Sequence, residues 1–474
     1  MNARWCVVVT LASALTASAC MVPPVVSTGV PGGGASPGRS PGDRISCALP
    51  SGAADFATAA PGAVGLDPAA VQRAVAYASD RGAESVRVYR HDCLVAASGL
   101  DAQYADQPLE GWSATKGVVS IAVGRAVALG LLAVDDPVGR YLPGLPADHA
   151  AITVRQFLTQ TSGLRMAWAN DLWAASATDS VADVLARPLE ARPGERFLYA
   201  QTAVSVLPAV VAAAAHEDFR SFVRRELFEP LGITDREWSW AHDPAGNTQG
   251  FAFLRLAPVG WARLGELLLH EGRWGDRRLL PAEYVRGGAE GTAVNPAYGF
   301  LWWTNHGDTQ LTAGFPDYER IDHRLWTALP PDAFGLSGLF GQDITVIPSL
   351  DMVLVRMGLP AELIMDPFGE PHGHRPPWDH RYHRMLMAGV LDARVADPGD
   401  WVWGGDDPPL DLFHIVEPGL PPFNGPSFAR LGVGPHPPVV RPSPPPAAVG
   451  PLPSPAASGW PWAPAVVPLA IVGG

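Results

Sequence analysis

The sequence predicts a mixed α/β fold in which one sheet is built from both ends of the folded region. Two observations support this prediction. Segments with strand character occur early, at 85–89 and 94–97, and again late, at 343–347 and 352–357. Between them the chain is dominated by apolar and amphipathic helical patterns. Elements in this order pack helices against a central sheet and add a helical insertion.

The N-terminal elements are the most clearly marked. A helix is expected over 68–79, where Asp67 can accept hydrogen bonds from the first turn and a proline suits the first helical position. Alternation over 85–89 predicts a half-buried strand, which turns into the strand at 94–97. The stretch 117–132 is apolar on nearly every face, which is typical of a buried helix.

The remaining elements follow from the same periodicities. In chain order we expect a helix at 152–158, a helical region at 202–228, a helix at 261–270, a strand at 298–303 and a closing helix at 379–393. Thr153 can cap the first of these helices. Residues 348–351 read as the turn that joins the two late strands.

One lysine stands out. Of the 34 lysine and arginine residues only Lys116 is a lysine, and it follows Ser113 by three positions. A buried ammonium can lose its proton, whereas a guanidinium stays charged. Residues three apart share one helix face, so Lys116 can activate the Ser113 hydroxyl as a nucleophile. Both would lie at the start of the 117–132 helix, where the helix dipole and free N–H groups favour an oxyanion.

The ends of the chain have a different composition. Residues 1–19 read as a signal peptide with a short apolar core and an Ala-Ser-Ala cleavage site, and Cys20 follows directly, as in bacterial lipoproteins. Residues 20–50 form a Pro/Gly-rich tether, 51–395 the folded domain and 396–474 a Pro-rich, largely disordered tail. We therefore expect an exported bacterial protein, held at the cell envelope by lipid on Cys20 or, alternatively, secreted.

The net charge and the cysteines limit which functions and which cysteine pairing are expected. The net charge is −13 with no basic stripe, which argues against nucleic-acid binding. If Cys6 leaves with the signal peptide and Cys20 carries lipid, then Cys47 and Cys93 remain, and in an exported protein they are expected to pair.

Two more segments are weak signals when taken alone. Tyr199 lies in the segment 192–201, which leads into a helix. A tyrosine beside a cationic lysine can serve as a general base, although core packing is the simpler interpretation from sequence alone. The segment 339–342 indicates only a turn ahead of a late strand.

A family resemblance changes the interpretation of both segments. From about residue 66 to 393 the chain resembles the class C β-lactamase-like serine hydrolases of the penicillin-binding-protein superfamily, which includes D-alanyl-D-alanine peptidases, esterases and 6-aminohexanoate-oligomer hydrolases. The resemblance rests on the order of the segments WSATKG (112–117), GLLAVDDPVGRYLPGL (130–145), ITVRQFLTQTSGL (152–164), RPGERFLYAQT (192–202), FEPLGI (228–233), ARLGELLLHEGRW (262–274), YGFLWW (298–303) and GQDITVIPSLDMVLVRMG (341–358). It implies a sandwich with a mainly antiparallel sheet, flanking helices and a helical lobe. It also implies that Ser113 is acylated, Lys116 is its partner and Tyr199 is a base.

The chain departs from the family pattern at two motifs. The family's Tyr-x-Asn reads Tyr199-Ala200-Gln201 here, and the glutamine reaches one methylene further. The third motif, Lys-Thr-Gly or a His/Trp variant, is assigned to Leu339-Phe340-Gly341, which lacks a cation for a substrate carboxylate. The backbone N–H groups of Ser113 and Gln342 are expected to form an oxyanion hole.

No metal or cofactor is expected. Four histidines look like a metal cluster at first, but their Pro-rich and Arg-rich surroundings favour solvated or packing roles; they are His372, His374, His380 and His383.

The sequence thus predicts an exported serine hydrolase that acts on a small-molecule ester, amide or peptide-like substrate through an acyl-enzyme on Ser113. Two alternatives remain open. One is a penicillin-binding D-alanyl-D-alanine peptidase or β-lactamase. The other is an envelope-tethered binding protein without catalytic activity.

Overall fold

The computed structural model describes residues 45–173, 177–312, 320–358, 378–405 and 420. The predicted signal peptide, Cys20 and most of the predicted tether and tail lie outside these residues, as do His372 and His374. Within the described ranges, no helix combines the length and apolar character that crossing a membrane requires.

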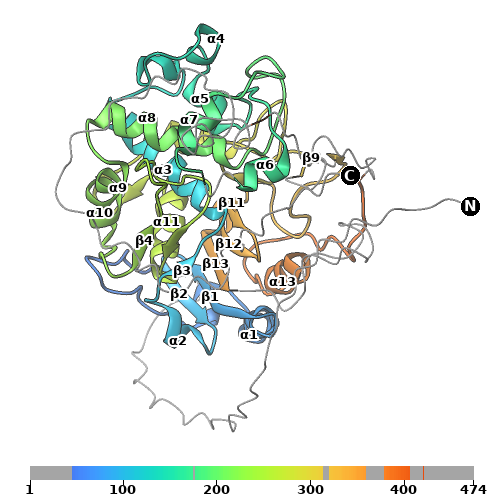
Figure 1. Ribbon diagram of the computed structural model, residues 1–474. Coiled ribbons are helices and arrows are strands. Elements are labelled where there is room, and N and C mark those ends of the chain that lie inside the picture. Colours follow the sequence, from blue (N-terminus) through green and yellow to red (C-terminus); the bar gives the residue numbers. More distant parts are fainter. Residues whose placement is uncertain (1–44, 174–176, 313–319, 359–377, 406–419, 421–474) are drawn as a thin grey trace, which may run out of the picture. The chain divides into compact units, whose positions relative to one another are not determined.

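The centre of the described chain is a six-stranded sheet with the order β2-β1-β13-β12-β11-β8 (Figure 1). Its strands are β1 Ala83–Arg90, β2 Cys93–Ala97, β8 Trp303–Thr304, β11 Phe334–Gly338, β12 Gln342–Ile347 and β13 Met352–Gly358. All neighbouring pairs are antiparallel. β1 pairs with β13 from Ala83↔Gly358 to Arg90↔Met352, so the sheet joins the two ends of the folded region as the sequence predicts.

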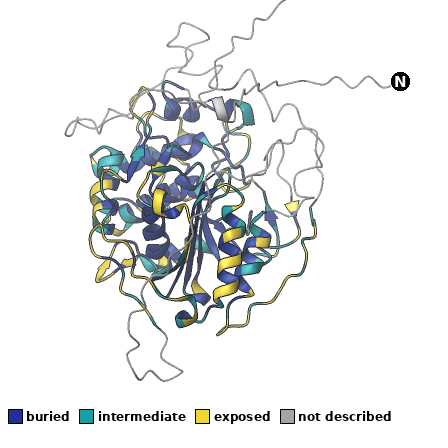
Figure 2. Cartoon of the chain, turned by 90° about the horizontal axis from the view of Figure 1, so that it is seen from below, coloured by how far each residue is buried: buried dark blue, intermediate teal, exposed yellow. Residues whose placement is uncertain are grey.

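Helices cover both faces of this sheet. The helices are η1 Pro61–Val64, α1 Pro68–Ser79, α2 Asp101–Tyr104, α3 Ala114–Ala128, η2 Val138–Arg140, α4 Ala147–Ala150, α5 Val154–Leu158, α6 Trp168–Trp173, α7 Ser180–Leu185, η4 Thr202–Ser205, α8 Val206–Ala215, α9 Phe219–Val223, η5 Arg224–Phe228, α10 Glu229–Leu231, α11 Pro258–Leu269, α12 Ala282–Ala289, η6 Pro348–Leu350 and α13 Trp378–Met387. α1 packs against β1 and α13, whereas α11 packs against β12 and β13 and α3 against β11. Figure 2 shows the buried strands between helices whose outer faces are exposed. The predicted mixed α/β sandwich with a mainly antiparallel sheet is therefore confirmed.

The described chain also contains three smaller sheets. They are β3 Leu109–Glu110, β4 Trp238–Trp240 and β5 Leu254–Leu256 in one three-stranded sheet, β6 Arg273–Trp274 with β7 Arg277–Arg278, and β9 Gln310–Leu311 with β10 Arg320–Ile321. The first of these sheets adjoins the start of α3, because β3 ends shortly before that helix begins and the Gly111 N–H donates to the Leu254 carbonyl in β5.

Several predicted elements are confirmed together with their caps. Asp67 accepts hydrogen bonds from the N–H groups of Ala69 and Ala70 at the start of α1. Thr153 forms a capping box with Gln156 at the start of α5. Such caps satisfy the donors that a helix N-terminus leaves free, which is why these boundaries could be read from the sequence.

Three predicted elements are corrected. Only Trp303 of the predicted strand 298–303 belongs to a strand, because Leu301 has a φ of 59° and turns the chain. The predicted helical region 202–228 breaks after α8 at His216, which has a φ of 55°, and restarts with Asp218 as the cap of α9. The closing helix ends at Met387 instead of residue 393.

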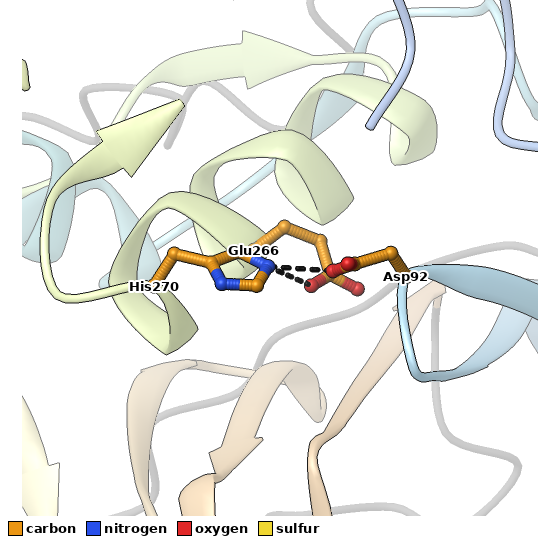
Figure 3. Close-up of side chains that lie close together, drawn as sticks. All are labelled: Asp92, Glu266 and His270. Carbon is orange, nitrogen blue, oxygen red and sulfur yellow. Dashed lines mark hydrogen bonds and ion pairs between the residues drawn. The ribbon is translucent and has the colours of Figure 1, made fainter. Parts of the chain in front are cut away.

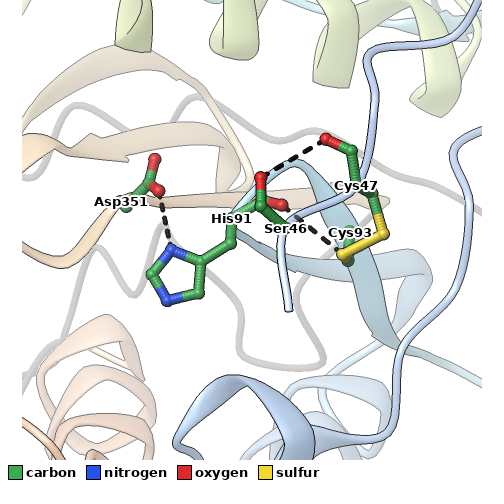
Figure 4. The surroundings of a disulfide bond; sticks show 5 residues. All are labelled: Ser46, Cys47, His91, Cys93 and Asp351. Carbon is green, nitrogen blue, oxygen red and sulfur yellow. Dashed lines mark hydrogen bonds and ion pairs between the residues drawn. A yellow bond between two sulfur atoms is a disulfide. The ribbon is translucent and has the colours of Figure 1, made fainter. Parts of the chain in front are cut away.

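A disulfide ties the N-terminal segment to the sheet. Cys47 and Cys93 are joined, and the Cys47 N–H donates to the His91 carbonyl at 2.9 Å (Figure 4). The segment that begins at residue 45 is thereby fixed beside the β1–β2 turn.

Candidate active site

The start of α3 places Ser113 and Lys116 on one face. Ser113 is the residue before the helix, and Trp112 before it has a φ of 47°, which turns the chain sharply into α3. Lys116 Nζ lies 2.9 Å from Ser113 Oγ. The contact predicted from the three-residue spacing is therefore present.

Lys116 is buried, and its hydrogen-bond partners among the described residues are all neutral. Its Nζ donates to Gln201 Oε1 at 2.6 Å and to the Phe251 carbonyl at 2.9 Å, in addition to Ser113. Burial lowers the pKa of Lys116 to about 7, and the negative charge of Asp171 opposes this change only in part. A substantial fraction of Lys116 is therefore neutral near pH 7 and can accept a proton.

Tyr199 lies beside this pair in an aromatic cluster. Lys116 Nζ is 4.8 Å from the centre of the Tyr199 ring, which stacks on Trp303 and meets Tyr298 edge-on. Burial raises the pKa of Tyr199 to about 12, while hydrogen bonding to Ser113 and Trp303 acts in the opposite direction. The Tyr199 hydroxyl is therefore protonated at neutral pH and can donate or relay a proton.

Gln201 makes the contact with Lys116 in spite of its extra methylene. Its backbone N–H donates to the carboxylate of Asp171, which also accepts from the N–H of Thr202 at 3.3 Å. Asp171 is in turn paired with Arg187 at 3.0 Å, and both side chains are fully buried. This ion pair fixes the turn that carries Gln201.

The sequence analysis did not predict the Asp171–Arg187 ion pair. Asp171 lies in α6 and Arg187 follows α7, so neither is near a recognisable motif in the chain. Only tertiary contacts bring the two residues to Gln201.

Glu110 is a second residue that the sequence analysis missed. Its Oε1 accepts from the N–H groups of Trp112 at 3.1 Å and Phe253 at 2.9 Å, while no described residue is hydrogen-bonded to its Oε2. Burial raises the pKa of Glu110 to about 7. Glu110 therefore links the turn before Ser113 to the segment whose Phe251 carbonyl binds Lys116. The sequence feature that could have drawn attention to Glu110 is its position three residues before Ser113.

The segment assigned to the third motif, Leu339-Phe340-Gly341, lies in the β11–β12 hairpin, and a neighbouring glycine makes the close approach to α3. A Cβ on Gly341 would lie 2.9 Å from Arg356 Nη1, whereas a Cβ on Gly338 would lie 2.4 Å from the Gly111 carbonyl and 3.0 Å from the Ala114 nitrogen. Gly338, not Gly341, is thus the glycine that permits close approach to the start of α3. Glycines recur at 335, 338 and 341, so spacing alone could not distinguish them.

The other residues assigned to this motif are divided between the surface and the sheet. Phe340 contacts the ring of Trp112, with centroids 5.2 Å apart, and Leu339 is 46% exposed at the hairpin tip. Gln342 turns its side chain into the sheet, where its Oε1 accepts from the Gly358 N–H at 2.9 Å. Leu339 and Phe340 therefore form an apolar edge near Ser113, and the Gln342 side chain belongs to the sheet.

The two described histidines of the apparent cluster have packing roles. His380 and His383 are buried on α13, where His380 contacts the Thr327 hydroxyl at 3.1 Å and His383 meets the ring of Trp326. Burial, assisted by His380, lowers the pKa of His383 to about 3. Neither residue belongs to a group of potential metal ligands among the described residues.

Comparison with known proteins gives a consistent assignment. The family model described as Beta-lactamase matches residues 71–358. Esterase EstB of Burkholderia gladioli is 32% identical over 149 residues, which cover 26% of this chain and 36% of the esterase. A penicillin-binding protein of Bacillus subtilis is 27% identical over 114 residues, which cover 22% of this chain and 25% of that protein. The chain thus spans about a third or less of these two relatives.

A solved structure extends the likeness over more of the fold. A family VIII carboxylesterase superposes with a TM-score of 0.50 and 16% identity, covering 68% of this chain and 97% of the carboxylesterase. At this identity the match supports the fold alone.

Proposed function

The chain belongs to the beta-lactamase family, and from this premise we propose that it is a serine hydrolase that cleaves an ester or amide bond through an acyl-enzyme on Ser113. The observation that carries the proposal is the 2.9 Å contact between Ser113 Oγ and the buried Lys116 Nζ. With the pKa of Lys116 at about 7, that contact joins a nucleophile to a base that is partly neutral near pH 7.

The proposed reaction has two steps. In the first, neutral Lys116 takes the Ser113 proton while Ser113 Oγ attacks the substrate carbonyl carbon. The bond to the leaving alcohol or amine then breaks, and the leaving group takes a proton through Tyr199. In the second step water attacks the acyl ester, its proton returns through the same groups, and Ser113 is released.

The developing oxyanion would be held by backbone donors. One is the N–H of Ser113. The other would come from the β11–β12 hairpin, either from Gln342, as the sequence predicts, or from Leu339, the residue after Gly338. The close approach of Gly338 to Ala114 favours Leu339.

The apolar hairpin edge favours an uncharged substrate. Leu339 and Phe340 offer no partner to a substrate carboxylate, and an unpaired carboxylate that loses water is costly. Short apolar acyl esters are therefore the expected substrate class, whereas anionic β-lactams should acylate poorly.

Two activity-based probes test the proposal. Purified protein is incubated with a fluorophosphonate and with a fluorescent penicillin, and Ser113→Ala serves as the control. We expect fluorophosphonate labelling that disappears in Ser113→Ala while its melting temperature is nearly unchanged. Labelling by the penicillin as well would favour the peptidase or β-lactamase alternative, and no labelling by either probe would favour a binding protein.

We also propose export, with attachment to the membrane through lipid on Cys20. The support is the composition of residues 1–20 together with the Cys47–Cys93 disulfide, since disulfides persist in oxidising compartments. Mass spectrometry of protein from a bacterial host should find a processed N-terminus and a lipid mass on Cys20. An intact residue 1–19 segment in the mature protein would refute the proposal.

A further inference from the structure

Two carboxylates and an imidazole meet at the end of the sheet that is distant from Ser113. Asp92 lies in the β1–β2 turn, Glu266 in α11 and His270 directly after α11 (Figure 3). The β1–β2 turn is hydrogen-bonded to the turn between β12 and β13 through the His91 N–H and the Asp351 carbonyl. The β11–β12 hairpin of the active site is at the opposite end of β12.

The three side chains present their donor atoms to one another. His270 Nε2 is 2.5 Å from Asp92 Oδ1 and 3.9 Å from Glu266 Oε2. One ligand atom from each residue lies within 4.8 Å of the other two. Ligands of a tetrahedral zinc ion at about 2.0–2.1 Å are about 3.3 Å apart, so small side-chain rotations suffice to form a site.

Glu266 is the observation that points to a ligand. The residue is 0% exposed, and no amine, amide or hydroxyl donor of the described residues is hydrogen-bonded to its carboxylate, so its close polar neighbours are the Asp92 carboxyl and the His270 imidazole. No described arginine forms an ion pair with it. A buried carboxylate without donors is unfavourable by several kcal/mol, on the order of the desolvation cost of an ion.

The neighbouring carboxyl groups add negative charge, and among the described residues the His270 imidazole, 3.9 Å away, is the potential cation in contact with Glu266. Burial, together with the charges of Asp92 and Asp351, raises the pKa of Glu266. Asp351 is shared with His91, whose Nδ1 is 2.7 Å from Asp351 Oδ2 (Figure 4). The free-energy cost of burying these carboxylates together can thus be lowered either by a proton on one carboxyl or by a bound cation.

We propose that Asp92, Glu266 and His270 bind a divalent transition-metal ion, with zinc the best match. Zinc accepts both imidazole nitrogen and carboxylate oxygen, whereas calcium and magnesium prefer oxygen ligands alone. Two carboxylates neutralise the charge of the ion. Glu266 and His270 are four residues apart, the spacing that presents two ligands on one face at the end of α11.

The bound ion would clamp the N-terminal part of the fold. It would join the β1–β2 turn to α11, one residue from the disulfide at Cys93. The His270 side chain is 31% exposed, which gives the ion a path from solvent and leaves room for a water ligand.

Metal binding to the full chain tests the proposal directly. Chelator-treated protein is titrated with zinc by calorimetry and with cobalt by absorption spectroscopy, and its melting is followed with and without each metal. We expect one equivalent to bind at this site, a tetrahedral-type cobalt spectrum and a higher melting temperature with zinc. Glu266→Gln and His270→Gln should each weaken this binding by at least about tenfold.

The control is Glu271→Gln, which changes a neighbouring glutamate that pairs with the exposed Arg286. This variant should bind like the unmodified protein. If Glu266→Gln does not fold, Asp92→Asn at the more exposed ligand replaces it. Failure of the unmodified protein to bind either metal, or unchanged binding in the ligand variants, would overturn the proposal and leave a protonated carboxyl as the state of Glu266.

Discussion

The two ends of the central sheet bury ionisable groups of opposite sign. At one end Lys116 donates to three neutral acceptors, Ser113, Gln201 and the Phe251 carbonyl, and no carboxylate in the described part of the chain pairs with it. At the other end Glu266 is buried among further carboxyl groups and contacts no ammonium or guanidinium among the described residues. Burial disfavours the charged form in both cases, so it lowers the pKa of the lysine and raises that of the glutamate.

The two ends differ in how the free-energy cost of the buried charge is lowered. Asp171, whose charge reaches Lys116, is held by Arg187 and does not pair with the lysine. Lys116 can therefore release its proton, and it becomes a base with the Ser113 hydroxyl beside it. Burial and the neighbouring carboxyl groups disfavour ionised Glu266, so a proton on its carboxyl or a bound cation would stabilise this cluster. The same cost of burying charge thus supports proton transfer at one end and ligand binding at the other.

The largest effect is expected from Lys116→Arg. Arginine keeps the positive charge but cannot act as a base, so turnover should fall at least about a hundredfold, in line with loss of a general base. Esterase assays with p-nitrophenyl butyrate measure this. Arg125→Lys is the matched control on α3, since Arg125 pairs with Glu226 away from Ser113. Normal turnover by Lys116→Arg would show that the lysine acts only as a fixed charge.

The second effect is on pH dependence. If neutral Lys116 is the base, the rate of Ser113 acylation should fall about tenfold per pH unit below about 7 and level off above it. The unfolded chain holds the lysine proton up to about 10.5, so the contribution of Lys116 to stability should rise with pH between about 7 and 10.5. Stopped-flow labelling and urea unfolding across this range measure the two quantities.

Glu110 is the competing explanation for a titration near pH 7, because its pKa is also raised to about 7. The fall in the acylation rate below about pH 7 should persist in Glu110→Gln if Lys116 is responsible for it. Its disappearance in that variant would assign the titration to Glu110.

A smaller effect is expected from Glu110→Ala, which removes the acceptor for the N–H groups of Trp112 and Phe253. Loss of this acceptor should loosen the turn before Ser113 and lower kcat by about tenfold, with a destabilisation of about 1–3 kcal/mol. Glu110→Gln retains Oε1 and should rescue most of the activity. Equal losses in both variants would mean that the charge matters, not the positioning of the backbone.

The smallest effect should be on specificity. Leu339→Lys places a cation at the exposed hairpin tip near Trp112, so it should raise the ratio of nitrocefin to p-nitrophenyl butyrate turnover by a few fold, within the range of surface charge effects. Salt should reduce the gain. Efficient nitrocefin hydrolysis by the unmodified protein would instead show that another residue already holds the substrate carboxylate.

The sequence predicted the parts of the fold that depend on local signals. Alternating or continuous apolar patterns between turn residues mark β1, β2, β12 and β13. The capping residues Asp67 and Thr153 mark the starts of their helices. β11 was missed because its sequence FGLSG is rich in glycine. Gly335 is needed there because a Cβ would come within 2.3 Å of the Ile344 carbonyl of the neighbouring strand.

The candidate site was predictable where its residues follow one another in the chain. Ser113 and Lys116 are linked by helix periodicity, and Tyr199 and Gln201 by a family motif. Asp171, Arg187 and the partners of Glu110 could not be predicted, since they meet only through tertiary packing. The same reason hid the cluster of Asp92, Glu266 and His270, whose two parts lie far apart in the sequence.

Because Lys116 is both the sole lysine and fully buried, the chain has one side-chain amine to offer to a chemical reagent. A small reductive-methylation reagent would modify this amine alone among the side chains, and a substrate analogue seated over Ser113 would protect it. Amine-modifying reagents label many surface lysines on most proteins. Here the extent of modification, measured by intact-protein mass spectrometry, would report whether the active site is occupied, without a mutation.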